Sequence, residues 1–116
     1  MATDCLFCKI IGGQIPAIVV VRDDRLIAIR DINPVAPTHI LLITVRHIAS
    51  IAEAEAEAGG AELIGALHLA AVKVAEQEGL SGGYRLVINN GRDGGQTVAH
   101  LHLHLIGGRA MHWPPG

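Results

Sequence analysis

The sequence predicts an α+β fold, in which an antiparallel five-stranded sheet is covered by one long helix and a short helix. Five short segments are rich in aliphatic and β-branched residues, and most of the links between them have hairpin length. Between the third and fourth of these segments, apolar residues recur at helical spacing. Strands on both sides of one long helix are typical of an antiparallel sheet backed by that helix.

The first half of the chain predicts three strands. Residues 15–17 contain Pro16 and indicate a turn, and the next two apolar segments flank Asp23 and Asp24 as in a hairpin. Residues 31–38 contain Pro34 and Pro37, which lack amide donors and disfavour regular structure. The strands expected here are residues 18–22, 26–30 and 39–45.

The second half predicts both helices and the last two strands. Residues 49–58 alternate alanine with glutamate, which favours a short solvated helix, and Gly59-Gly60 is expected to end it. Residues 61–77 carry the helical apolar pattern, and Gly79 lies where a helix C-terminus favours glycine. Strands are then expected at residues 84–88 and 100–106, separated by the glycine-containing loop 89–97.

Length and composition exclude several classes of protein. A chain of 116 residues without repeats or linkers predicts a single domain over residues 1–116. No stretch approaches the ~18 apolar residues of a membrane span, so we expect a soluble protein. The start Met1–Cys5 has no signal-peptide pattern, which favours a cytoplasmic location. A net charge of −2, without a Lys/Arg cluster, disfavours binding of a nucleic acid polymer.

The run His100-Leu101-His102-Leu103-His104 is the main chemical signal of the sequence. On a strand, the three imidazoles share one face at about 6 to 7 Å per pair, while the leucines share the other. Such a face has three interpretations: a solvated histidine surface, a zinc site, or a nucleophilic imidazole that forms a covalent intermediate.

Together with this run, several other segments resemble the histidine triad (HIT) superfamily, most closely its nucleoside phosphoramidase branch. The resemblance covers nearly the whole chain. It rests on residues 7–11, 31–32, 36–39, 94–97, 100–109 and the ending Met111-His112-Trp113-Pro114-Pro115-Gly116. It implies a HIT-like subunit whose sheet is joined to that of a second subunit in a homodimer. It also implies purine nucleoside monophosphates and their phosphoramidates as ligands.

The resemblance also assigns catalytic roles position by position. His102 matches the nucleophile that attacks the α-phosphorus and gives a nucleotidyl-histidine. His104 and Thr97 match positions near the phosphate and the leaving group, where donors stabilise phosphoryl oxygens. His39 and His100 match supporting histidines, which orient the reacting imidazole. Related nucleotidyltransferases carry glutamine where His104 stands, which favours hydrolysis over transfer.

A nucleotide pocket follows from the same resemblance. Asp31 matches a ribose-binding carboxylate, and the glycine-containing loop matches a phosphate-binding segment whose amides can approach an anion. Without the histidines, this loop would be an ordinary hairpin loop and Asp31 a turn residue. The residues expected to bind nucleotide are Phe7, Ile10, Asp31, Ile32, Asn89, Gly95, Gln96, Thr97, Val98, His102 and His104.

Cys5 and Cys8 have the two-residue spacing that lets both thiolates reach one zinc ion, and such a site needs two more ligands. His47 and His100 supply them in the pattern of zinc-binding members of the superfamily. We therefore expect a structural zinc and no organic cofactor. A thioredoxin-like role is disfavoured, because only four residues precede Cys5.

The sequence thus favours a hydrolase of purine nucleoside 5′-phosphoramidates. Two alternatives stay open: a regulatory module that binds purine nucleotides with residual hydrolysis, and a dinucleoside polyphosphate hydrolase. The ending from Gly107 to Gly116 favours the phosphoramidate hydrolase over the latter. His68 is expected to be an ordinary residue of the long helix.

Overall fold

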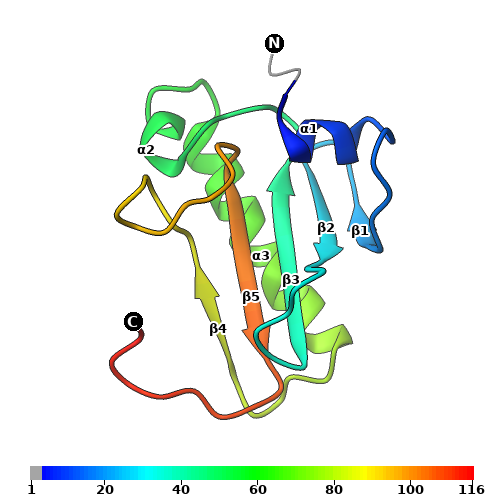
Figure 1. Cartoon of the computed structure of the whole chain (residues 1–116), viewed down its shortest axis with the longest axis vertical. Coiled ribbons are helices and arrows are strands. Elements are labelled where there is room, and N and C mark those ends of the chain that lie inside the picture. Colours follow the sequence, from blue (N-terminus) through cyan, green and yellow to red (C-terminus); the bar gives the residue numbers. More distant parts are fainter. Residues whose placement is uncertain (1–3) are drawn as a thin grey trace.

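The computed structural model describes residues 4–116, so most of the N-terminal stretch used for the location prediction lies outside the described residues. Figure 1 shows the sheet with the long helix behind it. The elements, in chain order, are α1 (Leu6–Ile11), β1 (Val19–Arg22), β2 (Leu26–Arg30), β3 (Thr38–Thr44), α2 (Ile51–Ala54), α3 (Gly60–Gln77), β4 (Tyr84–Val87) and β5 (His102–Gly107).

The five strands form one antiparallel sheet in the order β1-β2-β3-β5-β4, which confirms the predicted α+β class. β3 lies in the middle, and every one of its residues is buried. Its neighbour β5 comes from the far end of the sequence and pairs Leu103 with Leu42. This pairing brings the histidine run beside residues that come some sixty positions earlier in the chain.

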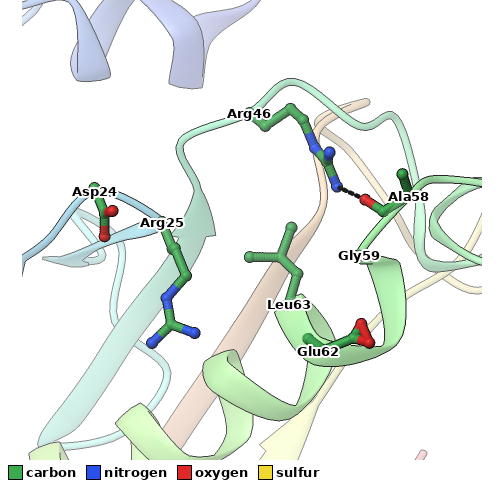
Figure 2. A pocket seen from close by; sticks show the side chains of 7 residues that line it. All are labelled: Asp24, Arg25, Arg46, Ala58, Gly59, Glu62 and Leu63. Atoms are coloured by element: carbon green, nitrogen blue, oxygen red, sulfur yellow. Dashed lines mark hydrogen bonds between the residues drawn. The ribbon is translucent and has the colours of Figure 1, made fainter.

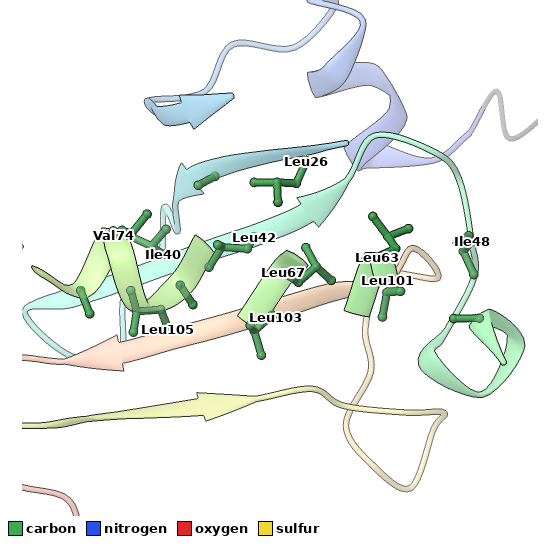
Figure 3. Close-up of a cluster of buried hydrophobic side chains, with 14 residues drawn as sticks. Leu26, Ile40, Leu42, Ile48, Leu63, Leu67, Val74, Leu101, Leu103 and Leu105 are labelled. Carbon is green, nitrogen blue, oxygen red and sulfur yellow. The ribbon is translucent and has the colours of Figure 1, made fainter. Parts of the chain in front are cut away.

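Helix α3 covers one face of the sheet and forms the larger core with it (Figure 3). Leu67 of α3, the two leucines of the histidine run and Leu105 directly after it are buried in this core. Burying each such side chain stabilises the fold by about 1.5 to 3 kcal/mol. The opposite face carries a smaller core around Phe7, Ile27, Ile29, Leu41 and Ile43. The histidines therefore lie on the α1 side of the sheet.

The sequence prediction of two helices is wrong, because α1 is a third helix in residues that had suggested none. Cys5 caps it, with its sulfur accepting a hydrogen bond from the amide of Cys8 at 3.4 Å. Six residues make fewer than two turns, too few for a helical period to be visible in the sequence. Packing of Phe7 against the sheet stabilises this helix.

The boundaries near α2 also differ from the prediction. The short helix covers only Ile51–Ala54, and Gly60 begins α3 instead of separating the two helices. Gly59 has φ +74°, a left-handed conformation that suits glycine. A Cβ on Gly60 would collide with the carbonyl of Ala54, so the close passage of α2 past α3 requires glycine there.

The last strand begins at His102 and not at His100. The amide of Leu101 donates to the carbonyl of Ile48 at 2.7 Å, and its carbonyl accepts from the amide of Thr44 at 3.3 Å. The chain is therefore held by the segment after β3 before the regular ladder starts. The predicted alternation is still present, since Leu101 enters the α3 core and His100 contacts Phe7 on the other face.

Within residues 4–116, no helix combines the length and the apolar composition that a membrane crossing requires.

Candidate functional site

His102 is held so that one ring nitrogen remains free. Its Nδ1 lies 2.6 Å from the carbonyl oxygen of His100. A carbonyl only accepts, so Nδ1 carries the proton and Nε2 keeps its lone pair. Burial lowers the pKa of His102, against the opposing influence of this hydrogen bond and of Asp31. The site therefore contains a neutral, oriented imidazole, the form that can act as a nucleophile.

His104 is the next histidine on the same face, and its ring centroid lies 5.0 Å from that of His102. Its Nδ1 is 2.9 Å from Nε2 of His39, which comes from the start of β3. The amide of Val35 donates to Nδ1 of His39 at 3.2 Å. These two contacts determine the positions of the protons on both rings.

The proton assignment runs from Val35 to His104. Because Nδ1 of His39 accepts, the neutral ring carries its proton on Nε2 and donates it to Nδ1 of His104. His104 must then carry its own proton on Nε2. Burial, together with neighbouring His102 and His39, lowers the pKa of His104 to about 4. His104 is therefore a neutral donor beside the free nitrogen of His102.

Asp31, His39 and His104 have ligand atoms within 4.8 Å of one another, a separation that could also suit a metal ion. The Asp31 carboxylate lies 3.5 Å from Nε2 of His39 and accepts from the amide of Asn33 at 2.8 Å. A metal on Nε2 of His39 would require the proton to move to Nδ1, where it would face the Val35 amide. The hydrogen bonds therefore favour a proton-sharing chain over a metal site here.

The cysteine pair meets His47 and His100 in a second cluster, whose ligand atoms also lie within 4.8 Å of one another. Nδ1 of His100 is 3.2 Å from Sγ of Cys5 and 3.1 Å from Nδ1 of His47. Sγ of Cys8 is 3.4 Å from Nδ1 of His47. All four residues that the sequence predicted as metal ligands are thus brought together.

The tautomer of His100 decides whether its nitrogen in this cluster is free to bind a metal ion. Nε2 of His100 donates to the carbonyl of Thr44 at 2.6 Å, so Nδ1 keeps its lone pair for the cluster. Two sulfur and two nitrogen donors match the ligand set of a closed tetrahedral zinc site. With all four positions filled by protein, such a site has no place for a reactive water. The residues therefore fit a structural zinc.

The remaining predicted nucleotide residues surround His102 unevenly. Phe7 packs edge-on against the His102 ring at 4.9 Å, and Ile10 packs beside the same small core. Ile32 is 90% exposed, so it does not contribute to a closed pocket in the structure. The slot expected for a base therefore has one buried wall and one open side.

The glycine-containing loop is arranged largely by Gln96. Its side-chain amide donates to the carbonyls of Ala49 and Val98, and its side-chain oxygen accepts from the amide of Gly91. Gln96 thus holds the loop together, while Thr97 is exposed. The other predicted residues of this segment, Asn89, Gly95 and Val98, range from exposed to half-buried.

Sequence reasoning missed the backbone groups that orient the histidines. The amide of Val35 and the carbonyls of Thr44 and His100 each determine the tautomer of one ring. Every residue has such groups, so no residue type signals their role. Only the folded arrangement of β3, β5 and the segments that precede them reveals these groups.

A separate cavity lies between the β1–β2 turn and the start of α3 (Figure 2). Arg46 donates to the carbonyl of Ala58 there, and Arg25 also lines it. Acidic Asp24 and Glu62 balance these two cations, and none of the histidines takes part. This cavity therefore lacks the chemistry found beside His102.

A five-stranded antiparallel sheet whose last strand carries alternating histidines next to a cysteine-histidine cluster defines the class of histidine triad proteins. The family model described as the HIT domain matches residues 12–111, and the chain belongs to this family.

Two relatives match almost the entire chain. The 14 kDa zinc-binding protein of Zea mays is 51% identical over 111 residues, covering 96% of this chain and 87% of the relative. Adenylylsulfatase HINT1 of Arabidopsis thaliana is 49% identical over 111 residues, covering 96% of this chain and 76% of the relative.

Solved structures show the same fold. A HIT family hydrolase from Legionella pneumophila superposes with a TM-score of 0.91 at 52% identity, covering 97% of this chain and 99% of the other. A zinc-bound histidine triad family protein from Mycobacterium smegmatis has a TM-score of 0.80 at 30% identity, covering 94% and 78%.

Proposed function

We propose that this protein is a hydrolase of purine nucleoside 5′-phosphoramidates, of the adenosine 5′-phosphoramidate type, which acts through a covalent nucleotidyl-His102. One observation carries the proposal: Nδ1–H of buried His102 donates a hydrogen bond to the His100 carbonyl at 2.6 Å, which leaves the lone pair of Nε2 free. The relation to a HIT family hydrolase supports the same reaction class.

In the first step, the lone pair of His102 Nε2 attacks the α-phosphorus and forms a phosphorus-nitrogen bond. The bond from phosphorus to the amine breaks, its electron pair stays on the amine nitrogen, and that nitrogen takes up a proton from solvent, which regains one when water attacks in the second step. His104 Nε2–H donates a hydrogen bond to the charge that develops on the reacting group. Water then displaces His102, which releases the nucleoside monophosphate. His100 and His39 orient the rings, and Thr97 offers a hydroxyl at the phosphate.

The nucleotide would lie along the α1 side of the sheet. Phe7, Ile10 and Ile32 would contact the base, and Asp31 would accept from the two ribose hydroxyls. Backbone amides of the loop would bind the phosphate oxygens. The loop residues in this proposal are Asn89, Gly95, Gln96, Thr97 and Val98.

Zinc bound by Cys5, Cys8, His47 and His100 would have a structural role. The ligand geometry and the zinc-binding relatives both support this ion. It would tie the start of α1 to the segment before β5, and so keep Phe7 beside His102. We propose no organic cofactor.

A second substrate is favoured by one comparison. The Arabidopsis relative is named adenylylsulfatase, which supports an adenylyl sulfate as an alternative to the phosphoramidate. Both substrates place an adenosine and an α-phosphorus at His102 and differ only in the leaving group. A regulatory nucleotide-binding module, or a dinucleoside polyphosphate hydrolase, would use the same pocket.

We also propose a homodimer in which the β4 edges of two sheets join. β4 is an edge strand, and Tyr84 on it lines one depression with Val72 of α3. Leu69 of α3 is also exposed. A second copy would cover these apolar side chains from both layers of the fold.

The test is hydrolysis of adenosine 5′-phosphoramidate and adenylyl sulfate by the wild type and by His102→Ala. The wild type is expected to hydrolyse at least one of them, and the variant neither. His68→Ala is the matched control, since His68 is a half-buried histidine of α3 that bonds only the carbonyl of Ile64 among residues 4–116. Equal rates for wild type and His102→Ala would refute the proposal.

A further inference from the structure

We infer that Arg109 is a positioning residue of the hydrolase, because its guanidinium holds the Val35 peptide that sets the tautomers of His39 and His104. This inference rests on the proposed function, in which His104 donates to the reacting group. The guanidinium touches neither histidine, so it acts only through the Val35 peptide.

The contact between Arg109 and Val35 joins the end of β5 to the loop before β3. Nε and Nη2 of Arg109 both donate to the carbonyl oxygen of Val35, at 3.3 and 3.1 Å. Nη1 donates to the carbonyl of Ala110 at 3.2 Å, which fixes the guanidinium plane. Two donors of one planar group on one oxygen hold this peptide in position better than a single flexible donor would.

The glycine directly before Arg109 lets the end of β5 pass close to the loop that contains Val35. A Cβ on Gly108, where φ is +93°, would lie 2.9 Å from Cβ of Pro37. The end of β5 thus passes directly over the loop that contains Val35. Gly108 allows this close passage, and Arg109 supplies the side chain that bonds the loop.

The loop that Arg109 holds has few hydrogen bonds of its own. Pro34 and Pro37 have no amide to donate. The amide of Val35 is directed to Nδ1 of His39, and within residues 4–116 the Val35 carbonyl accepts no hydrogen bond from the loop itself. Arg109 donates to this carbonyl, and it therefore restrains the residue whose amide determines the His39 tautomer.

Loss of this restraint has a defined chemical consequence. If the Val35 amide moves away, Nδ1 of His39 no longer faces a donor and can carry the proton itself. His39 would then accept from His104 through Nε2, and the proton of His104 would move to Nδ1. Nε2 of His104 would lose the hydrogen that it offers to the reacting group.

The experiment compares the wild type with Arg109→Ala, Arg109→Lys and Arg25→Ala. Arg25 is an exposed arginine whose side chain makes no hydrogen bond within residues 4–116, so its replacement controls for loss of charge. Two quantities are measured: kcat and KM for adenosine 5′-phosphoramidate, and the ring tautomer of His104 from two-bond proton-nitrogen correlations in nitrogen-15 NMR spectra. The His104→Gln variant assigns the resonances.

We expect His104 to be the Nε2–H tautomer in the wild type and in Arg25→Ala, and a mixture in Arg109→Ala. We expect kcat of Arg109→Ala to fall about tenfold with little change in KM, because the substrate contacts are intact and only the donor is misplaced. Arg109→Lys, or added guanidinium ion with Arg109→Ala, should restore part of kcat.

Each other outcome is decisive. An unchanged tautomer in Arg109→Ala overturns the inference, whatever happens to kcat. A changed tautomer with wild-type kcat overturns the positioning role. If the wild type hydrolyses neither substrate, the proposed function fails, and the tautomer measurement still tests the link from Arg109 to His104.

Discussion

At the scale of single residues, the histidines differ because each one faces a different backbone group. The His100 carbonyl leaves His102 with a free Nε2, whereas the Thr44 carbonyl leaves His100 with a free Nδ1. The alternation of the sequence showed equivalent imidazoles on one face. The roles proposed for them, a metal ligand, a nucleophile and a donor, depend on hydrogen bonds that only the folded chain provides.

The lowered pKa of His104 predicts a pH dependence of stability. An unfolded histidine titrates at about 6.5, whereas burial and two neighbouring rings lower the pKa of folded His104 to about 4. Between these values the unfolded state binds more protons, so the free energy of unfolding falls as the pH falls. The stabilisation that comes from keeping the His104 ring neutral is complete above the unfolded pKa of about 6.5. It is lost as the pH falls toward the folded pKa of about 4.

Urea unfolding of the wild type and His104→Gln at about pH 7 and about pH 5 checks this expectation. Glutamine does not titrate, so the variant should lose less free energy of unfolding between the two conditions than the wild type. Equal losses in both proteins would show that His104 does not titrate as stated.

At the scale of elements, α1 links the cysteine-histidine cluster to His102, the proposed nucleophile. Cys5 and Cys8 flank Phe7, whose ring lies 4.9 Å from that of His102. Removal of zinc should therefore release α1 and open the side of the proposed nucleotide pocket where Phe7 would contact the purine base. It should not remove the nucleophile, because β5 holds His102 independently in the ladder with β3.

Chelation of zinc should accelerate amide hydrogen exchange in residues 6–11 and raise KM by about tenfold, while covalent turnover persists at high substrate concentration. Cys8→Ser, which removes a metal ligand but leaves the Cys5 cap of α1 in place, should reproduce this effect. Turnover that stops while exchange in residues 6–11 stays slow would instead indicate a catalytic metal.

The elements were predictable where their patterns were long. The strand pattern and the apolar period of α3 sufficed for the α+β class and the five strands. α1 was not predictable, since its six residues depend on a cysteine cap and on the packing of Phe7. For the same reason the start of β5 was placed two residues early, because long-range hydrogen bonds of Leu101 decide it.

The candidate site was predictable to a similar extent. Residue types and family pattern were enough to name the four metal ligands, which the structure brings together, and the histidines around His102. Ile32 was expected in an apolar slot and is almost fully exposed, because the proline-containing loop turns it outward. The orienting backbone groups left no trace in the sequence.

At the scale of the whole molecule, the two sheet edges differ in what lies beside them. The β4 edge is flanked by apolar residues of α3, among them Val72. At the other edge, Val19 of β1 and Ile18 just before it are exposed, and Arg22 donates to the carbonyl of Ile11 at the end of α1. Joining β4 edges would bury apolar surface from the sheet and the helix together. This is the physical basis of the proposed homodimer.

Leu69→Lys and Ile18→Lys provide a matched pair, since both side chains are 68% exposed. In sedimentation equilibrium, Leu69→Lys should shift the protein toward monomer, because a charge would be buried in the interface. Ile18→Lys should leave the wild-type association unchanged. A monomeric wild type, or dissociation by Ile18→Lys alone, would contradict the proposed interface.

The central claim is that His102 becomes covalently bonded to the nucleotide, and the most direct test is the intact mass of protein quenched during turnover of adenosine 5′-phosphoramidate. We expect a population of wild-type protein heavier by one adenylyl group, located on His102 by peptide mapping under conditions that preserve phosphorus-nitrogen bonds. His102→Ala should show no adduct and no turnover. Turnover by His102→Ala, or an adduct located on another residue, would contradict the account.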